Sequence, residues 1–430
     1  MIEAKILKGF RDFLPQDEIA RKSLSEKAES VFRSFGYVPI DTPALEYTEI
    51  LLGKGGGETE KQIYRFNDNG GRDVSLRFDL TVPFARYIAQ HREELVFPFK
   101  RYHIAKVWRG ENTQKGRYRE FTQCDFDCIG ADNAASDFEI LFMIKTALEK
   151  QTTSGVTIHV NHRLIFNKFL KNICGANAKA DTAEEILRIV DKLAKIGAEE
   201  VQNQLSALLD NEGAEKILDF ISPKSTWDET FAAMVQAAGG EDENTKRLQT
   251  IHKFMIDAGV ENSYVLDPSI TRGLDYYTGI VFETFLNELP SIGSICSGGR
   301  YDNLMGLYSK TPLSGVGGSI GLDRLIAGLE ALNISTSQKT YAKLCIANLN
   351  EDQCGLYQKL AAVIRDAGIP CEVLSEAKKQ TAQFIEAEKK GAAYVLLPCE
   401  SDPVEGPFVL RNLATRENVK VCGIAGLKSL

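Results

Sequence analysis

The sequence contains no apolar run that is long enough to cross a membrane. A membrane-spanning helix needs ~20 apolar residues in succession, and the longest apolar runs, such as Ala392–Pro398, are much shorter. The N-terminus carries Lys5 and Lys8 within its only apolar stretch and lacks a small-residue cleavage pattern, so it does not resemble a signal peptide. We therefore expect a soluble protein that has no membrane partner.

Paired cysteine motifs are also missing. The nine cysteines are an odd number, and no two of them are spaced as C-x-x-C. A disulfide scaffold and a structural zinc site are therefore both disfavoured, and a reducing, cytoplasmic location fits the cysteine pattern best. We expect no zinc in this protein.

Basic residues are outnumbered by acidic ones, 51 to 59. The formal net charge of −8, taken alone, argues against a nucleic-acid partner. Residues 97–121, however, carry seven Lys or Arg against two Asp or Glu, and residues 340–430 carry eleven of each sign. A basic stripe of this kind on an acidic body can still bind the phosphates of a nucleic acid.

The composition, 43% apolar and 26% charged in 430 residues, is typical of globular domains. Apolar spacing predicts an amphipathic first helix over Asp17–Phe35 and a helical region from about Ala178 to Met255. A polar linker is expected at Asn333–Thr340. Strands alternate with helices beyond it, ending at Phe408–Leu410, which indicates a separate small α/β domain. Before this linker, the expected strands are Tyr37–Ile40, Ser75–Thr81, Arg101–Glu111, Phe121–Ile129, Val156–Val160, Tyr264–Leu266 and Tyr276–Phe285.

A hairpin is predicted where two extended segments flank the polar turn Asn112–Gly116. Alternate residues of a strand share a face. A solvated face laced with ion pairs is the usual interpretation of such charged strands, but an aromatic ring among the charges and a basic loop argue against it. The residues expected on one face are Arg109, Glu111, Phe121, Gln123, Asp125 and Asp127, and the basic loop holds Lys115, Arg117 and Arg119.

Two other segments each allow two interpretations. Asp79 and Thr81 should share a strand face, where the carboxylate could bind a substrate amine or could cap the following helix. The glycines of residues 53–57, with Lys54, suggest a phosphate loop but do not fit G-x-x-x-x-G-K-[ST]. A flexible loop that closes over a substrate is the better interpretation there.

Arginine stands beside glycine in two further runs. Arg272-Gly-Leu-Asp-Tyr-Tyr277 combines a cation, a carboxylate and two phenols. The run Gly-Leu-Asp-Arg324 ends a glycine-rich stretch at the start of a predicted helix. Taken singly, an arginine at such a site is more often a surface ion pair than a phosphate ligand.

Taken together, these segments resemble the three signature motifs of class II aminoacyl-tRNA synthetases. Motif one corresponds to the first helix and the strand ending Asp41-Thr-Pro43, motif two to Trp108–Phe121, and motif three to Gly315–Arg324. The runs Arg272–Tyr277 and Gly298-Gly-Arg-Tyr-Asp302 are similar to runs that, within this class, only histidyl-tRNA synthetases carry. The resemblance to that family covers almost the whole chain, from Lys8-Gly-Phe-Arg-Asp-Phe-Leu-Pro15 onward.

The resemblance implies an α+β fold, in which a class II catalytic core on an antiparallel sheet carries a helical insertion and is followed by a small α/β anticodon-binding domain. The implied boundaries are residues 1–170 and 261–332 for the core, 171–260 for the insertion and 340–430 for the anticodon-binding domain. A homodimer that forms through motif one is also implied.

The same resemblance implies that L-histidine reacts with ATP, accompanied by Mg²⁺, to give histidyl-adenylate, which is then transferred to the 3′ end of tRNA(His). Arg109 and Arg272 would clamp the α-phosphate. The residues implied for ATP are Arg109, Glu111, Phe121 and Arg324, and those for tRNA are Lys115 and Arg117. The residues implied for histidine are Asp79, Thr81, Gln123, Asp127, Arg272, Tyr277 and Tyr301.

Three alternatives are weaker. An inert regulatory paralogue of the family typically lacks the anticodon-binding domain and a complete Arg272–Tyr277 run, and this chain has both. A synthetase for another amino acid is disfavoured by the two histidine-specific runs, and a tRNA-binding module without chemistry by the three arginines. Asp79 and Asp127 stand where the family often has Glu, which keeps the charge but shortens the reach by one methylene.

Overall fold

The computed structural model divides the chain into two compact units. The first comprises residues 1–11 and 24–335, and the second comprises residues 12–23 and 336–430. Each unit has its own sheet and its own buried core. The residues that the structure describes are 1–53, 59–152, 155–174, 180–271, 277–302, 306, 308, 313–334, 338–399 and 404–427.

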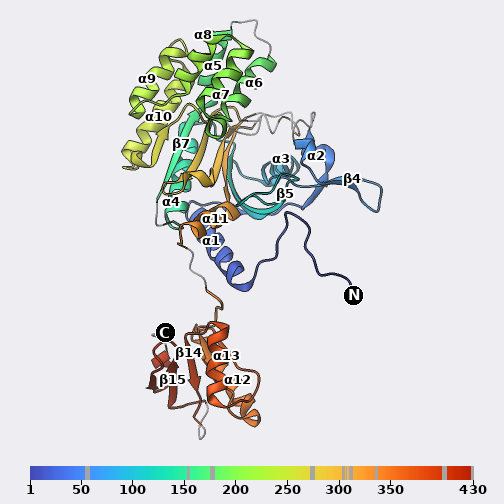
Figure 1. Cartoon of the computed structure of the whole chain (residues 1–430), viewed down its shortest axis with the longest axis vertical. Coiled ribbons are helices and arrows are strands. Elements are labelled where there is room, and N and C mark those ends of the chain that lie inside the picture. The colour runs from blue at the N-terminus through green and yellow to red at the C-terminus, as the bar shows by residue number, and fades with distance from the viewer. Residues whose placement is uncertain are drawn as a thin grey trace. The chain divides into compact units, whose positions relative to one another are not determined.

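An eight-stranded sheet forms the body of the first unit (Figure 1). Its order is β1-β5-β6-β11-β10-β9-β7-β8, and its pairs are antiparallel except at the two edges, where β1 with β5 and β7 with β8 run parallel. The strands are β1 (Val38–Pro39), β5 (Phe99–Trp108), β6 (Glu120–Ile129), β7 (Val156–His162), β8 (Tyr264–Leu266), β9 (Ile280–Leu286), β10 (Cys296–Tyr301) and β11 (Gly315–Gly321).

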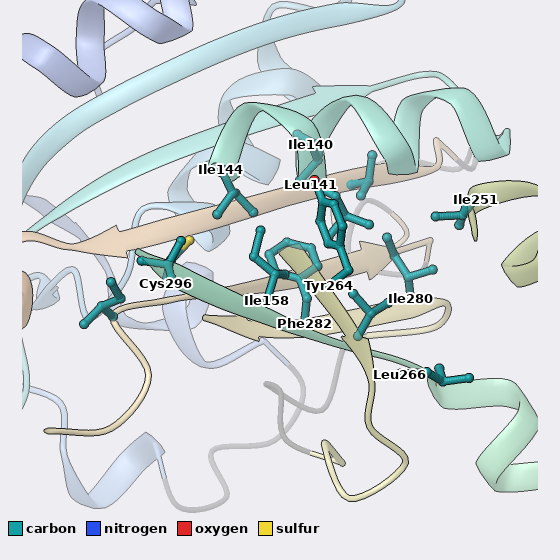
Figure 2. Close-up of a cluster of buried hydrophobic side chains, with 14 of the residues drawn as sticks. Ile140, Leu141, Ile144, Ile158, Ile251, Tyr264, Leu266, Ile280, Phe282 and Cys296 are labelled. Atoms are coloured by element: carbon teal, nitrogen blue, oxygen red, sulfur yellow. The ribbon is translucent and has the colours of Figure 1, made fainter. Parts of the chain in front are cut away.

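One face of this sheet is covered by helices. Figure 2 shows Ile140 and Ile144 of α4 (Ala134–Glu149) within the cluster that includes Ile158 and Phe282 of the sheet. Phe32 of α1 (Pro15–Ser34) belongs to the same buried cluster. The even-numbered residues of the central strands point toward these helices and are largely apolar, so this face forms the main core of the unit.

The opposite face of the sheet carries the odd-numbered residues of the central strands. Helix α3 (Thr81–Gln90) packs on it through Phe84, whose ring centre lies 4.2 Å from the guanidinium carbon of Arg101 on β5. A three-stranded sheet of order β2-β4-β3 is also part of this unit. Its elements are β2 (Leu45–Tyr47), β3 (Arg65–Asn67) and β4 (Asp73–Leu76), with α2 (Thr48–Leu52) after β2.

Between β7 and Asp257 the described residues form six helices, α5 to α10, and Figure 1 shows these helices gathered beyond that strand. We call them the helical bundle. Phe169 of α5 stacks on Phe220 of α8 with ring centres 4.0 Å apart, and Phe254 of α10 contacts Phe138 of α4. The helices are α5 (Arg163–Cys174), α6 (Ala180–Val190), α7 (Leu193–Leu208), α8 (Asn211–Ile221), α9 (Trp227–Ala237) and α10 (Glu243–Asp257).

The second unit contains a five-stranded sheet of order β13-β12-β14-β15-β16. The first three strands are parallel and the last two pairs are antiparallel. The sequence does not predict β16, which is short and mostly exposed. The whole architecture is α+β, as predicted. The elements of this unit are β12 (Leu344–Ile346), α12 (Cys354–Asp366), β13 (Cys371–Val373), α13 (Gln380–Lys390), β14 (Tyr394–Leu397), β15 (Phe408–Asn412) and β16 (Asn418–Val421).

The predicted strand over Ser75–Thr81 is wrong in its second half. Strand β4 ends at Leu76, and Thr81 is the first residue of α3. The carboxylate of Asp79 accepts a hydrogen bond of 3.1 Å from the backbone N–H of Val82, which is the contact of a helix cap. Asp79 and Thr81 therefore do not share a strand face, and the capping interpretation is confirmed.

The predicted strand over Arg101–Glu111 is also too long. Strand β5 ends at Trp108, and the backbone N–H of Gly110 donates instead to the carbonyl of Gln62, at 2.7 Å. Arg109 and Glu111 therefore lie in the loop of the β5–β6 hairpin rather than on its strand. The hairpin itself is confirmed, with Trp108 opposite Glu120 as its innermost pair.

Candidate active site

A buried cluster of charged side chains occupies the polar face of the large sheet. The side chains of Asp79, Asp125 and Asp127 lie around Arg101, and each of the four residues is at most 2% exposed. The hairpin register places Arg101 opposite Asp127, and its Nη2 lies 2.6 Å from Oδ2 of that carboxylate. Within this cluster, which we call the carboxylate cluster, the acids outnumber the guanidinium.

Burial changes the protonation of these acids. Loss of hydration disfavours a charged carboxylate, so burial raises the pKa of Asp79 to about 6 and the pKa of Asp125 to about 7. Burial also raises the pKa of Asp127, and Arg101 acts in the opposite direction by attracting the charged form. A ligand that brings a positive charge to this cluster would stabilise the ionised acids.

Two buried acceptor atoms of this site also favour a ligand with N–H groups. Oδ2 of Asp79 and Oε1 of Gln123 find no hydrogen-bond partner within the described part of the chain. The amide nitrogen of Gln123 is held by Oγ of Ser319, at 2.9 Å, which fixes the orientation of the side chain. Leaving a buried acceptor without a donor is costly, and the N–H groups of a ligand would remove that cost.

One tyrosine contacts the carboxylate cluster, and a second belongs to the same group of packed apolar residues as the first. The hydroxyl of Tyr301 donates to Oδ1 of Asp127 at 2.6 Å, and the two residues lie on strands that flank β11. A Cβ atom on Gly317 of β11 would lie 2.0 Å from that same oxygen, so only glycine leaves the path open. The ring of Tyr277 lies against Gly299, where an added Cβ would come within 2.9 Å of it.

The hairpin loop brings a cation beside an aromatic ring. The guanidinium carbon of Arg109 lies 5.2 Å from the ring centre of Phe121, and Nη1 of Arg109 lies 3.8 Å from Oε1 of Glu111. Nε of Arg109 donates to the carbonyl of Phe78 at 2.9 Å. Because Phe78 precedes Asp79, this bond places the guanidinium next to the carboxylate cluster.

The tip of the hairpin lies against the start of α11 (Leu322–Ala331). A Cβ atom on Gly116 would lie 3.5 Å from Cα of Arg324, whose guanidinium donates to the carbonyl of Ser294 at 2.6 Å. Lys115 is exposed, and Nη1 of Arg117 lies 3.5 Å from Oε2 of Glu111. Basic side chains thus line the rim of the loop.

The structure does not place every predicted site residue, and it adds residues to the site that the sequence did not predict. Arg272 and residues 54–58 lie outside the described residues. The sequence reasoning placed Asp125 on the correct face without giving it a role, and it missed Arg101 and Ser319. A hairpin centred on the predicted turn would have paired Arg101 with Asp127, so the register was the available signal for Arg101.

The described residues contain no group of three or more His, Cys, Asp or Glu side chains placed to hold a metal ion. Nor does any helix in this part of the chain have the length and apolar character needed to cross a membrane.

Comparison with known proteins identifies the family. The family model described as Histidyl-tRNA synthetase matches residues 9–325. The chain is 55% identical over 411 residues to the histidine–tRNA ligase of Treponema denticola, an alignment that covers 94% of this chain and 91% of that protein. The chain belongs to the histidyl-tRNA synthetase family. The histidine–tRNA ligase of Rhodopirellula baltica, another relative, is 44% identical over 98% of this chain and 96% of its own length.

Solved structures of the family agree with the fold. The crystal structure of histidyl-tRNA synthetase from Nostoc sp. PCC 7120 superposes with a TM-score of 0.89 at 30% identity and covers 100% of this chain and 99% of that chain. The apo histidyl-tRNA synthetase of S. aureus has the same fold, with a TM-score of 0.69, at 21% identity, covering 99% and 98% of the two chains. The class II architecture expected from the sequence is therefore confirmed.

Proposed function

We propose that this chain is a histidine–tRNA ligase, which activates L-histidine with ATP to histidyl-adenylate and then transfers the histidyl group to the 3′ end of tRNA(His). The observation that carries this proposal is the carboxylate cluster, with its unfilled buried acceptors, directly beside the Arg109–Phe121 pair. The cluster suits an amino acid and the pair suits a nucleotide. Family membership supports both assignments.

The amino-acid site would divide between the two ends of histidine. The ammonium group would bind Asp79 and Gln123, with Thr81 of α3 beside them. A neutral imidazole ring offers one donor and one acceptor. Asp127 and the phenols of Tyr277 and Tyr301 can supply the complementary groups, while Arg272 would lie near the carboxylate that reacts.

The activation step needs positioning and charge neutralisation. The histidine carboxylate attacks the α-phosphorus of ATP, pyrophosphate leaves, and negative charge grows on the α-phosphate oxygens. Arg109 and Arg272 would neutralise this charge, because the planar guanidinium fork suits phosphate oxygens. Phe121 and Arg324 would hold the adenine between them, and Glu111 would orient the nucleotide. Mg²⁺ bound to ATP would reduce the charge of the outer phosphates.

The transfer step needs the tRNA acceptor end at the same site. Lys115 and Arg117 on the rim of the hairpin loop would bind its phosphates. The proposed domains follow the expected boundaries: residues 1–170 and 261–332 for catalysis, 171–260 for contact with the acceptor arm, and 340–430 for the anticodon. We also propose that the protein is a cytoplasmic homodimer.

The decisive experiment is ATP–pyrophosphate exchange measured with each standard amino acid in turn. We expect exchange that depends on histidine and on no other amino acid, followed by charging of tRNA(His). Exchange with a different amino acid would identify another synthetase. Histidine binding without any exchange would favour an inert regulatory paralogue.

A further inference from the structure

A buried aspartate on α4 is held by two arginines from different parts of the first unit. The side chain of Asp137 has no exposed surface. Its Oδ1 accepts a hydrogen bond from Nε of Arg300 on β10, at 2.8 Å, and lies 2.7 Å from Nη2 of the same guanidinium. Its Oδ2 accepts from Nε of Arg247 on α10 of the helical bundle, at 2.7 Å. The single carboxylate therefore joins the bundle to the central sheet.

The charges of this network are nearly balanced. Nη1 of Arg247 also donates to Oδ1 of Asp132, at 2.6 Å, and Nη1 of Arg300 lies 3.7 Å from the same atom. Nη1 of Arg300 also lies 3.9 Å from Oδ1 of Asp302, so two arginines face three aspartates. Buried ion pairs of this kind add little stability compared with apolar side chains of similar volume. We therefore look for a role of this network in positioning other residues.

From Arg300 the network continues to the tyrosines assigned to histidine. Nη1 of Arg300 donates to Oγ of Ser314, which donates to Oδ1 of Asp302 at 2.5 Å. The other carboxylate oxygen of Asp302 accepts from the hydroxyl of Thr278, also at 2.5 Å. The backbone N–H of Thr278 donates to the carbonyl of Arg300 at 2.7 Å, which closes the ring.

The ring of contacts joins residues that are sequence neighbours of both tyrosines. Tyr301 stands between Arg300 and Asp302 in the sequence, and Tyr277 directly precedes Thr278. Arg300 points toward the helices on one side of β10, while Tyr301 points toward the carboxylate cluster on the other, because successive residues of a strand alternate in direction. The residues on either side of Tyr301 are thus held by contacts of the Arg300 side chain, in addition to the pairing of β10 with β11.

We propose that Arg247 of the helical bundle is a positioning residue for the histidine site, acting through Asp137 and Arg300. Without Arg247, Oδ2 of Asp137 lacks its donor in a buried environment. The guanidinium fork of Arg300 would then rotate to bind both oxygens and would withdraw Nη1 from Ser314. Asp302 and Thr278 would lose their alignment, and with them the two phenols. This inference rests on the proposed function.

The test compares Michaelis constants in histidine-dependent ATP–pyrophosphate exchange by the full-length protein, without tRNA. We expect Arg247→Met to raise the KM for histidine roughly three- to thirtyfold and to change the KM for ATP less than about twofold, which is the range of couplings through packed networks. Arg247→Lys keeps the charge and should recover part of the loss. Lys253→Met, which removes an exposed ion pair with Asp257 from the same helix, should change neither constant.

Ser314→Ala is a second variant that breaks the same chain of contacts without altering a buried charge. It should raise the KM for histidine on its own, and the double variant should be no worse than the more affected single variant, because both changes break one path. A lower melting temperature with unchanged KM for histidine, equal rises for histidine and ATP, or additive effects would overturn the inference. A wild-type protein without histidine-dependent exchange would overturn the proposed function, and the inference with it.

Discussion

Tyr301 donates a hydrogen bond to Asp127 across the strand that separates them. The hydroxyl of Tyr301 on β10 lies 2.6 Å from Oδ1 of Asp127 on β6, and β11 runs between the two strands. The contact is possible because Gly315 and Gly317 of β11 have no side chains. A Cβ atom on Gly315 would lie 2.6 Å from the Tyr301 ring, and one on Gly317 would lie 2.0 Å from the Asp127 carboxylate.

We therefore expect Gly317→Ala to remove histidine-dependent exchange. The added methyl group overlaps both the Asp127 carboxylate and the carbonyl of Phe126, 2.7 Å away, and neither can move without disturbing β6. Overpacking of this kind typically costs about 1–3 kcal/mol of stability. Gly321→Ala is the matched control on the same strand, since its Cβ would have no neighbour closer than 3.8 Å. Equal activity of the two variants would contradict the prediction.

Asp125→Asn should change how stability depends on pH. Burial raises the pKa of Asp125 to about 7 in the folded protein, whereas an unfolded aspartate titrates near ~3.9. The folded state therefore binds more protons between these values, and its stability falls as the pH rises through that window. We expect the free energy of unfolding of Asp125→Asn to exceed that of the wild type by about 1–3 kcal/mol at pH 8, with a higher melting temperature, and the difference to be smaller at pH 5.

Asp219→Asn is the control for this measurement, because its carboxylate is 81% exposed. If the stability of the wild type and of Asp125→Asn changed with pH in parallel, the Asp125 carboxyl group would make no contribution to the pH dependence of stability. A slope that remains in Asp125→Asn is expected in part, since burial also raises the pKa of Asp79 to about 6.

Arg272→Ala should abolish most adenylate formation while leaving the fold and much of the histidine affinity intact. A guanidinium directed at the α-phosphate stabilises the transition state more than the ground state, so its loss appears in the rate. Losing one preorganised donor typically costs ~10²–10³ in rate. Single-turnover adenylate formation at saturating ATP and histidine, with the melting temperature measured alongside, tests this. A rate within about fivefold of wild type, a barrier change of roughly 1 kcal/mol, would remove Arg272 from the mechanism.

Deletion of the residues after Asn333 should spare adenylate formation and severely reduce tRNA charging. Residues 336–430, which make up most of the second unit, carry its five-stranded sheet and its core, so their removal leaves the carboxylate cluster in place. Exchange and charging assays on the truncated protein separate the two steps. Loss of exchange in a truncated protein that still melts cooperatively would contradict a modular arrangement.

Light scattering should give a mass near twice the 47.6 kDa of one chain. Strand β1 lies at the edge of the large sheet, where its backbone can pair with a second copy, and Val38 is 47% exposed. Tyr47 and Phe66, on strands flanking β4, are also about half exposed on the three-stranded sheet. Tyr47→Asp should shift the protein toward the monomer, and a stable monomer of the wild type at micromolar concentration would refute the dimer.

Local sequence patterns were sufficient for much of the fold. The first helix, the β5–β6 hairpin and the alternation of strands and helices after the linker follow from apolar spacing and turn residues. They failed where a side chain redirected the backbone, as Asp79 does by capping α3. They also failed at β16, which has too little buried surface to leave a signal.

The candidate site was predictable only in part, because its contacts depend on register and on distant segments. Asp127 was placed on the correct face by strand alternation and given its role by the family resemblance, whereas its partner Arg101 required the alignment of two strands. The Asp137–Arg300 pair joins residues 163 positions apart, and no local pattern indicates such a contact.

Because Gly317 has no side chain, the residues allowed at position 317 depend on those at positions 127 and 301. A chain that replaced Gly317 with a larger residue would first have to shorten Asp127 or give up its bond to Tyr301, and either change alone impairs the site. A side chain at position 317 is therefore closed to gradual drift, whereas position 127 can exchange one carboxylate for another. Among relatives, a residue larger than glycine should appear at position 317 only where the bond between positions 127 and 301 has been lost.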